Sequence, residues 1–147
     1  MKRKQYPYMP KFIDKYIGKY PLSLRSSWEL KFAQWLDYNE LVIKWSYERH
    51  AIPYYNPIYK DYKRYFPDFY AKIKNNNGYT EYIIEIKPKK ETVPPKKTNK
   101  QSKKTKLYQE ATYLTNQAKF EAARVYTKKM RMSFKIITEI ELFKENK

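Results

Sequence analysis

Three charged side chains near the middle of the chain could together carry out metal-assisted hydrolysis. Asp68 follows Pro67, and Glu85 and Lys87 lie two residues apart. If residues 82–87 form a strand, its period of two places Glu85 and Lys87 on one face. Two carboxylates held close together repel each other and lose hydration unless a proton or a cation joins them. A hard divalent ion such as Mg²⁺ prefers oxygen ligands, and a neighbouring lysine can orient or deprotonate an attacking water.

Residues 64–88 predict a β-hairpin that would bring these groups together. Both halves are rich in aromatic and β-branched residues, and residues 75–78 between them are a turn sequence. A two-residue turn at positions 77 and 78 would place Asp68 opposite Lys87, whereas a four-residue loop would place it opposite Glu85. Either even loop puts the three groups on one face, and an odd loop would turn Asp68 away. A strand face with cross-strand ion pairs is the purely structural alternative.

Charge and composition restrict the functional class. The chain has 32 Lys and Arg against 15 Asp and Glu, a net charge of +17, for which nucleic acid is the usual partner. There is no cysteine and a single histidine, which argues against a zinc site and leaves oxygen ligands for any metal. No bilayer-spanning apolar run or signal peptide is present, so we expect no membrane partner and a cytoplasmic protein. The length of 147 residues, 41% of them hydrophobic, fits one domain.

The segments before the hairpin predict an arm, a helix and two strands. Residues 1–25 are basic and rich in Tyr and Pro, and we expect an extended arm lying against the body or DNA. Residues 27–38 predict a helix, and residues 41–48 and 49–55 predict strands. The apolar stripe of the helix consists of Trp28, Phe32, Trp35 and Leu36.

Two glutamates in these elements could serve either structure or chemistry. Glu29 stands three residues after Ser26, which is the spacing of a capping box in which Glu29 accepts the Ser26 amide. Glu29 also lies at the edge of the apolar stripe, on the same flank as Ala33 and Leu36. Glu48 ends its strand beside Arg49 and His50, and a charged residue in that position needs no catalytic role.

The segments after the hairpin predict a basic loop, a long helix and a closing strand. Residues 89–106 contain eight lysines and a Pro pair, which favours a mobile loop that either binds DNA phosphates or serves as a solvated linker. Residues 105–129 predict a helix, residues 133–137 a strand, and a capping box at Thr138 a short terminal helix. The face that we expect the long helix to bury consists of Ala111, Leu114, Ala118, Ala122 and Val125.

The chain resembles the PD-(D/E)XK nucleases. Pro67-Asp68 and Glu85-Ile86-Lys87 fit their motif, and the order helix, strands, hairpin, helix, strand fits their core. Within that superfamily the chain resembles the head completion nucleases of T-even-type bacteriophages. The blocks that carry this closer resemblance are RSSWELKF at 25–32, WSYE at 45–48, IPY at 52–54, RYFPDF at 64–69, IEIKP at 84–88 and NQAKFEAA at 116–123.

The resemblance implies a site as well as a fold. The fold would be a restriction-endonuclease-like α/β core with a central mixed sheet flanked by helices. The catalytic residues would be Glu29, Asp68, Glu85 and Lys87, with Mg²⁺ as the cofactor and Mn²⁺ as a substitute. Asp68, Glu85, Glu29 and the carbonyl of Ile86 would bind the metal, while Lys87 would orient the water or stabilise developing negative charge.

The resemblance also implies DNA as the substrate and a phage endonuclease that acts at the portal or neck, in the host cytoplasm during assembly or in the virion neck. A junction resolvase, which would act as a homodimer, and a transposon end-cutting nuclease remain alternatives. A non-catalytic DNA-binding protein of the virion is a third. The residues that we expect to contact DNA are Arg64, Lys89, Lys96, Lys97, Lys103, Lys104 and Lys119.

Overall fold

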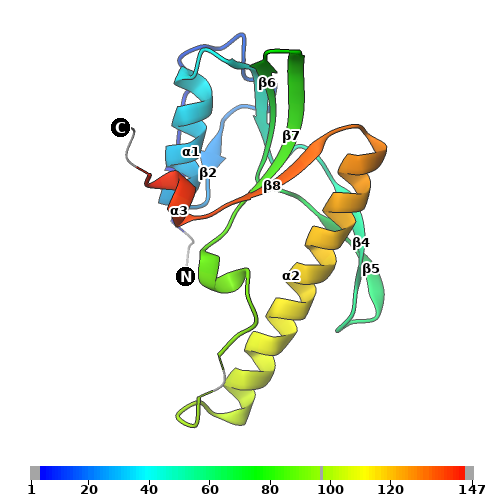
Figure 1. Ribbon diagram of the computed structural model, residues 1–147. Coiled ribbons are helices and arrows are strands. Elements are labelled where there is room, and N and C mark those ends of the chain that lie inside the picture. The colour runs from blue at the N-terminus through cyan, green and yellow to red at the C-terminus, as the bar shows by residue number, and fades with distance from the viewer. Residues whose placement is uncertain (1–3, 97, 145–147) are drawn as a thin grey trace.

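The computed structural model describes residues 4–96 and 98–144, which form a mixed α/β fold (Figure 1). In chain order the elements are β1 (Tyr6–Pro7), β2 (Ser23–Leu24), α1 (Ser27–Tyr38), β3 (Val42–Tyr47), β4 (Ile52–Asn56), β5 (Asp61–Tyr65), β6 (Phe69–Asn75), β7 (Gly78–Ile86), the 3-10 turn η1 (Lys89–Glu91), α2 (Lys103–Lys129), β8 (Ser133–Ile137) and α3 (Glu139–Leu142). This agrees with the predicted α/β class.

The main sheet has four strands in the order β3-β6-β7-β8. Its first three strands are antiparallel, and β8 pairs in parallel with β7 because α2 carries the chain across the sheet between them. The β6–β7 turn pairs Asn75 with Gly78, and Gly78 adopts a φ of +120° that only glycine tolerates well. The even loop is therefore confirmed, with the register that sets Asp68 at the level of Glu85.

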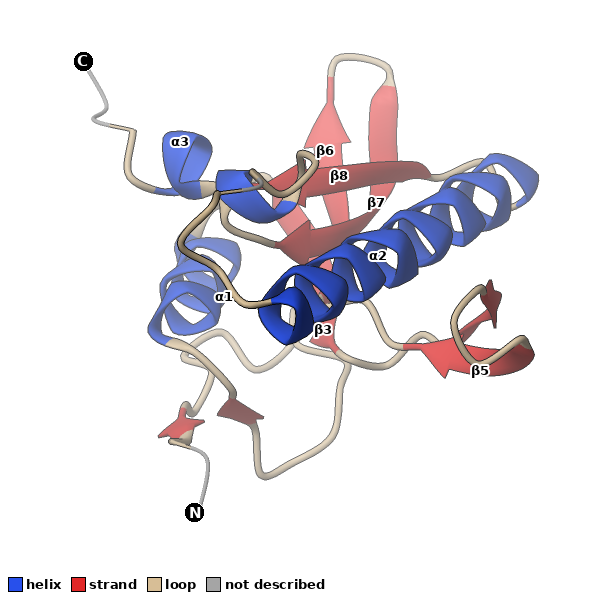
Figure 2. Ribbon diagram, turned by 90° about the horizontal axis from the view of Figure 1, so that it is seen from below, coloured by secondary structure: helices blue, strands red, loops and turns tan. Residues whose placement is uncertain are grey.

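Each face of the sheet has its own apolar core, and the alternation along β7 separates them. Ile84 and Ile86 pack in the cluster beneath α1, whereas Ile83 packs in the cluster beneath α2. Figure 2 shows α1 and α2 on different sides of the sheet. In α1 the side chains of Phe32 and Leu36 are buried as predicted, but Trp35 is 47% exposed and stacks on Phe32 at the edge of the core.

The face that α2 buries agrees with the predicted one only in part, because Ala118 and Ala122 pack against the core but other predicted residues do not. Leu114 and Val125 are exposed. The residues that α2 buries instead are Asn116, Phe120, Ala123 and Thr127. The Thr127 hydroxyl donates to the Ala123 carbonyl at 2.8 Å, so two polar residues share this face with Phe120. Polar residues at the buried positions concealed the true stripe from an analysis of hydrophobic spacing.

The N-terminal arm lies against the body of the protein over its described residues. Tyr16 is buried beside Trp45 of β3, with ring centroids 4.7 Å apart. The fully buried Asp37 of α1 accepts the amides of Lys11 and Phe12 at 2.7 and 3.0 Å and the hydroxyl of Tyr8. A buried carboxylate therefore fixes the arm to the C-terminal end of α1.

The predicted hairpin strand beginning at residue 64 is wrong in its first part. Strand β5 ends at Tyr65, the chain turns at Phe66–Asp68, and β6 begins at Phe69. Strand β5 pairs instead with β4 in a separate two-stranded ribbon that lies along α2 (Figure 1). The cause is Pro67, which has no amide proton to donate to a ladder and favours a break.

The lysine-rich segment after β7 is partly regular. Residues 89–91 form η1, and α2 begins at Lys103, so the last part of the predicted loop is helical. Ser102 caps α2 by accepting the amide of Thr105 at 3.1 Å. In the part of the chain that the structure describes, no helix combines the length and the apolar character that crossing a bilayer requires.

Candidate active site

Asp68 lies at the centre of the candidate site and is held by the backbone on both sides. Its carboxylate accepts the amide of Ile86 at 2.7 Å, and its carbonyl accepts the amide of Glu48 at 2.8 Å. The first contact joins the end of β7 to the loop before β6, and the second joins that loop to the end of β3. Three consecutive neighbours in the sheet therefore position one side chain.

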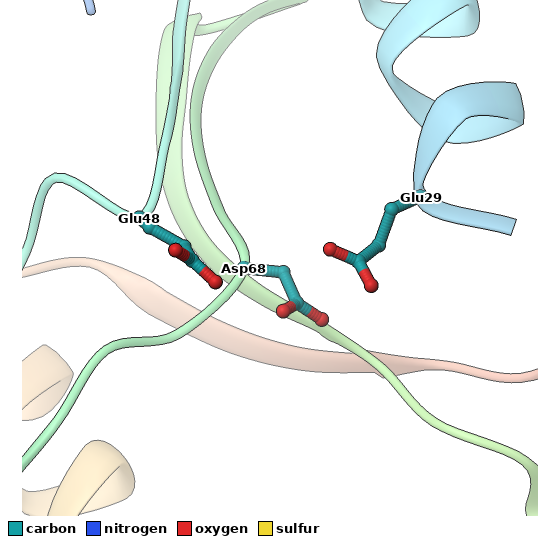
Figure 3. Close-up of side chains that lie close together, drawn as sticks. All are labelled: Glu29, Glu48 and Asp68. Carbon is teal, nitrogen blue, oxygen red and sulfur yellow. The ribbon is translucent and has the colours of Figure 1, made fainter. Parts of the chain in front are cut away.

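Three carboxylates converge at this point. Glu29, Glu48 and Asp68 each place one oxygen so that all three atoms lie within 4.8 Å of one another. Figure 3 shows the three side chains pointing toward a common space, from the first turn of α1, the end of β3 and the loop before β6. Segments far apart in the sequence thus supply one acidic group, which we call the carboxylate group.

Hydrogen bonds orient Glu29 toward this group. Its carboxylate accepts the hydroxyls of Tyr47 and Ser26 at 2.5 and 2.9 Å, while Ser26 accepts the amide of Glu29 at 3.1 Å. Ser26 therefore caps α1, but Glu29 does not complete the box through the Ser26 amide. The Glu29 carboxylate is directed to the sheet rather than back along its own helix.

Glu48 reaches the group through an unusual backbone conformation. Its φ of 49° lies in the left-handed region, which is costly for any residue with a Cβ. Arg25 lies 3.3 Å from its carboxylate, on the exposed side. Such strain at a non-glycine residue is typical of positions where function fixes the side chain.

Glu85 and Lys87 lie beside the carboxylate group and contact each other. Lys87 Nζ is 3.5 Å from one oxygen of Glu85, and the hydroxyl of Tyr65 donates to the other at 2.7 Å. Both residues are largely buried. Lys119 of α2 approaches from the same side, with its Nζ 5.7 Å from the ring centroid of Tyr65. The predicted pair Glu85–Lys87 is thus brought next to Asp68, on the α2 side of the sheet.

Burial and mutual repulsion make protonation of these acids easier. Desolvation, then the charges of Glu85 and Glu29, raise the pKa of Asp68 well above its usual range. Desolvation also raises the pKa of Glu48, which Arg25 partly offsets. The pKa of Glu85 is raised by burial in spite of Lys87 and Tyr65. Among the described residues, Arg25 and Lys87 pair with Glu48 and Glu85 but leave Glu29 and Asp68 without an ion pair, so the site favours a further cation.

The donor set fits a hard divalent ion. Carboxylate oxygens are the ligands that Mg²⁺ and Mn²⁺ prefer, and the described chain brings no histidine into the group. Glu29, Glu48 and Asp68 could hold such an ion together. Glu85 and the carbonyl of Ile86, both predicted as ligands, lie on the neighbouring strand β7.

Sequence reasoning considered Glu48 but did not include it among the site residues, although it belongs to the carboxylate group. One signal was available, because Glu48 follows the strand that pairs with the Asp68 strand and so ends on the same edge of the sheet. Its left-handed backbone, which directs the side chain inward, has no signature in the sequence.

The residues predicted to contact DNA are dispersed over several elements. Arg64 of β5 and Lys89 of η1 are exposed, as are Lys96, Lys103 and Lys104, whereas Lys119 is partly buried beside Glu85. Lys97 lies outside the described residues. A cavity of about 560 Å³ between the lysine-rich segment and α2 is lined by none of the four candidate site carboxylates.

Two comparisons with known proteins bear on this site. The family model described as TnsA-like endonuclease N terminal matches residues 39–139, a range that contains Glu48, Asp68, Glu85 and Lys87. The head completion nuclease of Enterobacteria phage T4 is 38% identical over 136 residues, which covers 90% of this chain and 89% of the T4 protein. These matches and the mixed sheet agree with the predicted restriction-endonuclease-like fold.

Proposed function

The chain belongs to the TnsA-like endonuclease family, and from that premise we propose that it is a metal-dependent endodeoxyribonuclease of phage head completion. It would hydrolyse phosphodiester bonds of DNA. The observation that carries this proposal is the convergence of Glu29, Glu48 and Asp68 next to the Glu85–Lys87 pair. The net charge of +17 supports a polyanionic substrate.

We assign metal binding to the carboxylate group together with Glu85 and the Ile86 carbonyl. Mg²⁺ is the proposed ion, with Mn²⁺ as a substitute, because the ligands are all oxygen. When bound, the ion would polarise the scissile phosphate and lower the pKa of a bound water. Both oxygens of Glu85 contact Tyr65 or Lys87, so Glu85 would exchange one of these contacts if it ligated the metal.

The other side chains of the site orient and balance charge. Lys87, held by Glu85, would direct the attacking water or stabilise the negative charge that develops on the phosphate. Tyr47 and Tyr65 donate to Glu29 and Glu85 and fix the directions of these carboxylates. Exposed lysines and arginines would bind DNA phosphates, without any base-specific contact that we can identify.

The biological setting extends the T4 comparison. The T4 protein is named for head completion, and we propose the same stage for this chain, with portal or neck proteins as partners, in the host cytoplasm or at the virion neck. A transposon end-cutting nuclease is the second candidate, which the TnsA-like family model favours. A junction resolvase is a further alternative. A resolvase would act as a homodimer, so the mass in solution is informative.

Asp68→Asn tests the proposal. The substitution keeps an acceptor for the Ile86 amide but removes the central charge, so cleavage should be lost while DNA binding is retained. Glu85→Gln should act in the same direction. Asp14→Asn, which alters an exposed acid of the N-terminal arm, is the matched control and should cleave normally.

Cleavage should be measured on linear, four-way and single-stranded DNA with Mg²⁺ or Mn²⁺. Wild-type cleavage by folded Asp68→Asn would contradict the proposed site. Selective cleavage of the four-way junction by a dimer would favour the resolvase. Absence of cleavage by the wild-type protein with either ion would favour a virion DNA-binding protein instead.

A further inference from the structure

The two faces of the β4–β5 ribbon differ in character. The inner face packs against α2 through Ile52, Tyr54 and Tyr65. On the outer face, Tyr55 and Tyr62 are paired across the two strands, and their ring centroids are 5.2 Å apart in an edge-to-face arrangement. Tyr62 is 75% exposed, and Tyr59 in the connecting turn is 72% exposed. Tyr55 is 49% exposed, so all three rings remain largely open to solvent.

Basic side chains lie among the exposed rings. Lys63 Nζ is 4.9 Å from the ring centroid of Tyr59, and the guanidinium of Arg64 is 5.5 Å from that of Phe66. Residues 52–66 contain three basic residues and one acidic residue. A surface that interleaves cations with aromatic rings complements a strand that carries both phosphates and flat bases. A protein partner would not require this excess of positive charge.

The ribbon is joined directly to the candidate active site. It is the segment between Glu48 and Asp68, and the bond from the Glu48 amide to the Asp68 carbonyl closes its base. At its inner end Tyr65 donates to Glu85. Strands of five residues extend about 17 Å at roughly 3.3 Å per residue, so the exposed tyrosines lie a few nucleotides from the carboxylates.

We propose that the outer face of the β4–β5 ribbon stacks on unpaired bases of DNA, so that the protein binds most tightly to DNA with a single-stranded segment beside the cut. This inference rests on the proposed function, from which the cut at the carboxylate group is taken. Bases in an intact duplex have both faces covered by their neighbours. Tyr55, Tyr59 and Tyr62 can therefore stack only where bases are unpaired or turned outward.

Binding to short fluorescent strands tests this without cleavage. One strand is oligothymidylate, and the other has the same length but abasic sugars, so it keeps the phosphates and lacks the rings. The Tyr59→Ala/Tyr62→Ala protein should lose about tenfold in affinity for oligothymidylate per stacked base that it no longer binds. Its affinity for the abasic strand should not change, and neither should its salt dependence, because no charge is removed.

Two further variants complete the experiment, and all anisotropy measurements are made without added divalent ion. Tyr59→Phe/Tyr62→Phe keeps the rings and should restore affinity for oligothymidylate. Tyr79→Ala removes another exposed tyrosine, near the start of β7, and should bind like the wild type. Thermal unfolding of each variant should match the wild type, since the altered rings are exposed.

The outcomes separate stacking from the proposed nuclease activity. An equal loss on both strands, or no loss on either, would overturn stacking, and the second result would fit a protein partner for the ribbon. Cleavage is measured independently with Mg²⁺ or Mn²⁺ and Asp68→Asn. If base-dependent binding is found without cleavage, the ribbon inference stands while the proposed function fails. If cleavage is found without base-dependent binding, the proposed function stands while the ribbon inference fails.

Discussion

Glu48 combines a strained backbone conformation with a place in the carboxylate group. A left-handed backbone at a residue with a Cβ costs of order 1–2 kcal/mol, and Glu48 has a φ of 49°. Its carboxylate is also partly desolvated, which raises its pKa. Neither feature stabilises the fold, so the residue is better explained by the cation that the group would hold.

Replacing Glu48 with glycine should therefore separate stability from function. Glycine adopts this backbone conformation without strain but also makes the unfolded chain more flexible, so we expect the free energy of unfolding to stay equal or to rise by up to about 1 kcal/mol. Cleavage should fall by at least about tenfold. Urea unfolding and a nicking assay would measure both quantities.

Glu48→Gln is the control for the shape of the side chain, because it keeps the strain and removes only the charge. It should lose cleavage like the glycine variant but gain no stability from relief of strain. A clear loss of stability in Glu48→Gly, or normal cleavage in both variants, would show that Glu48 serves the fold.

At the scale of elements, the sequence predicted the features that depend on residues close together in the chain. The i, i+4 spacing of Phe32 and Leu36 located α1. The even loop limited the hairpin to two registers, and the structure has the one that brings Asp68 level with Glu85. These features depend on residues close in sequence. The helix, the hairpin core and the placement of the motif were therefore predictable.

Other features depended on tertiary contacts and were missed. Strand β5 pairs with β4 rather than continuing into β6, because Pro67 breaks the chain and Tyr65 packs toward α2. The buried face of α2 includes Asn116 and Thr127, whose polarity hides it from a search for apolar spacing. The sequence predicted the strand that precedes Glu48, but it did not predict the left-handed backbone conformation at Glu48. The direction of the Glu48 side chain could therefore not be predicted.

The contact of Tyr47 with Glu29 connects β3 to α1, and variants of these two residues test whether this connection supports cleavage. The Tyr47 hydroxyl donates to the Glu29 carboxylate, and burial together with this bond raises the pKa of Tyr47. Glu29→Gln should leave the Ser26 cap in place and cost little stability, but it should lower cleavage about tenfold or more. Tyr47→Phe should lower cleavage less, because the carboxylate remains and only its orientation is loosened.

The measurement is the cleavage rate of each folded variant beside its thermal unfolding. Full activity in Glu29→Gln would mean that Glu29 serves only the fold. A larger loss of cleavage in Tyr47→Phe than in Glu29→Gln would mean that Tyr47 acts independently of Glu29.

The first turn of α2 carries cations at the wrong end of a helix dipole. Lys103 and Lys104 lie there and no acid does, although cations at a helix N-terminus are unfavourable by about 0.3–1 kcal/mol each. An anionic partner would offset this cost. Replacing both lysines with Gln should reduce the slope of log affinity against log salt on duplex DNA by about 0.9 for each phosphate that the variant no longer binds. Thermal stability should stay equal or rise.

Lys128 and Lys129 in the last turn of α2 provide the matched control, because their replacement changes the net charge equally where the dipole favours cations. Their Gln variant should bind with a nearly unchanged slope and lose slight stability. Parallel salt plots for the wild type and the Lys103/Lys104 variant would show that the start of α2 does not contact DNA.

For the whole molecule, the candidate site is a cluster of carboxylates in a protein with a net charge of +17. The sheet brings its carboxylates to one edge and desolvates them, while 32 basic residues are spread over the rest of the chain. Such an arrangement draws a polyanion to the surface and a cation to the centre. This arrangement lowers the stability of the fold, because buried carboxylates of like charge repel each other.

This cost should appear in the pH dependence of stability. The pKa of Asp68 is raised in the folded state, so above the unfolded value of about 3.9 the folded protein binds more protons than the unfolded one. Stability from this group is therefore full below about pH 4 and is lost as the pH rises through the folded pKa. Asp68→Asn removes the titration, so its advantage in melting temperature over the wild type should grow from pH 4 upward.

A divalent ion should reverse that advantage. Mg²⁺ or Mn²⁺ that binds only the folded protein adds stability that increases with the logarithm of its concentration. The wild type should gain melting temperature when the ion is added at pH 8, whereas Asp68→Asn should gain much less. Melting curves of both proteins at several pH values, with and without the ion, measure both effects. An equal gain in the two proteins would show that the ion binds away from Asp68, and a pH-independent difference would show that Asp68 is ionised as easily in the folded chain as in the unfolded one.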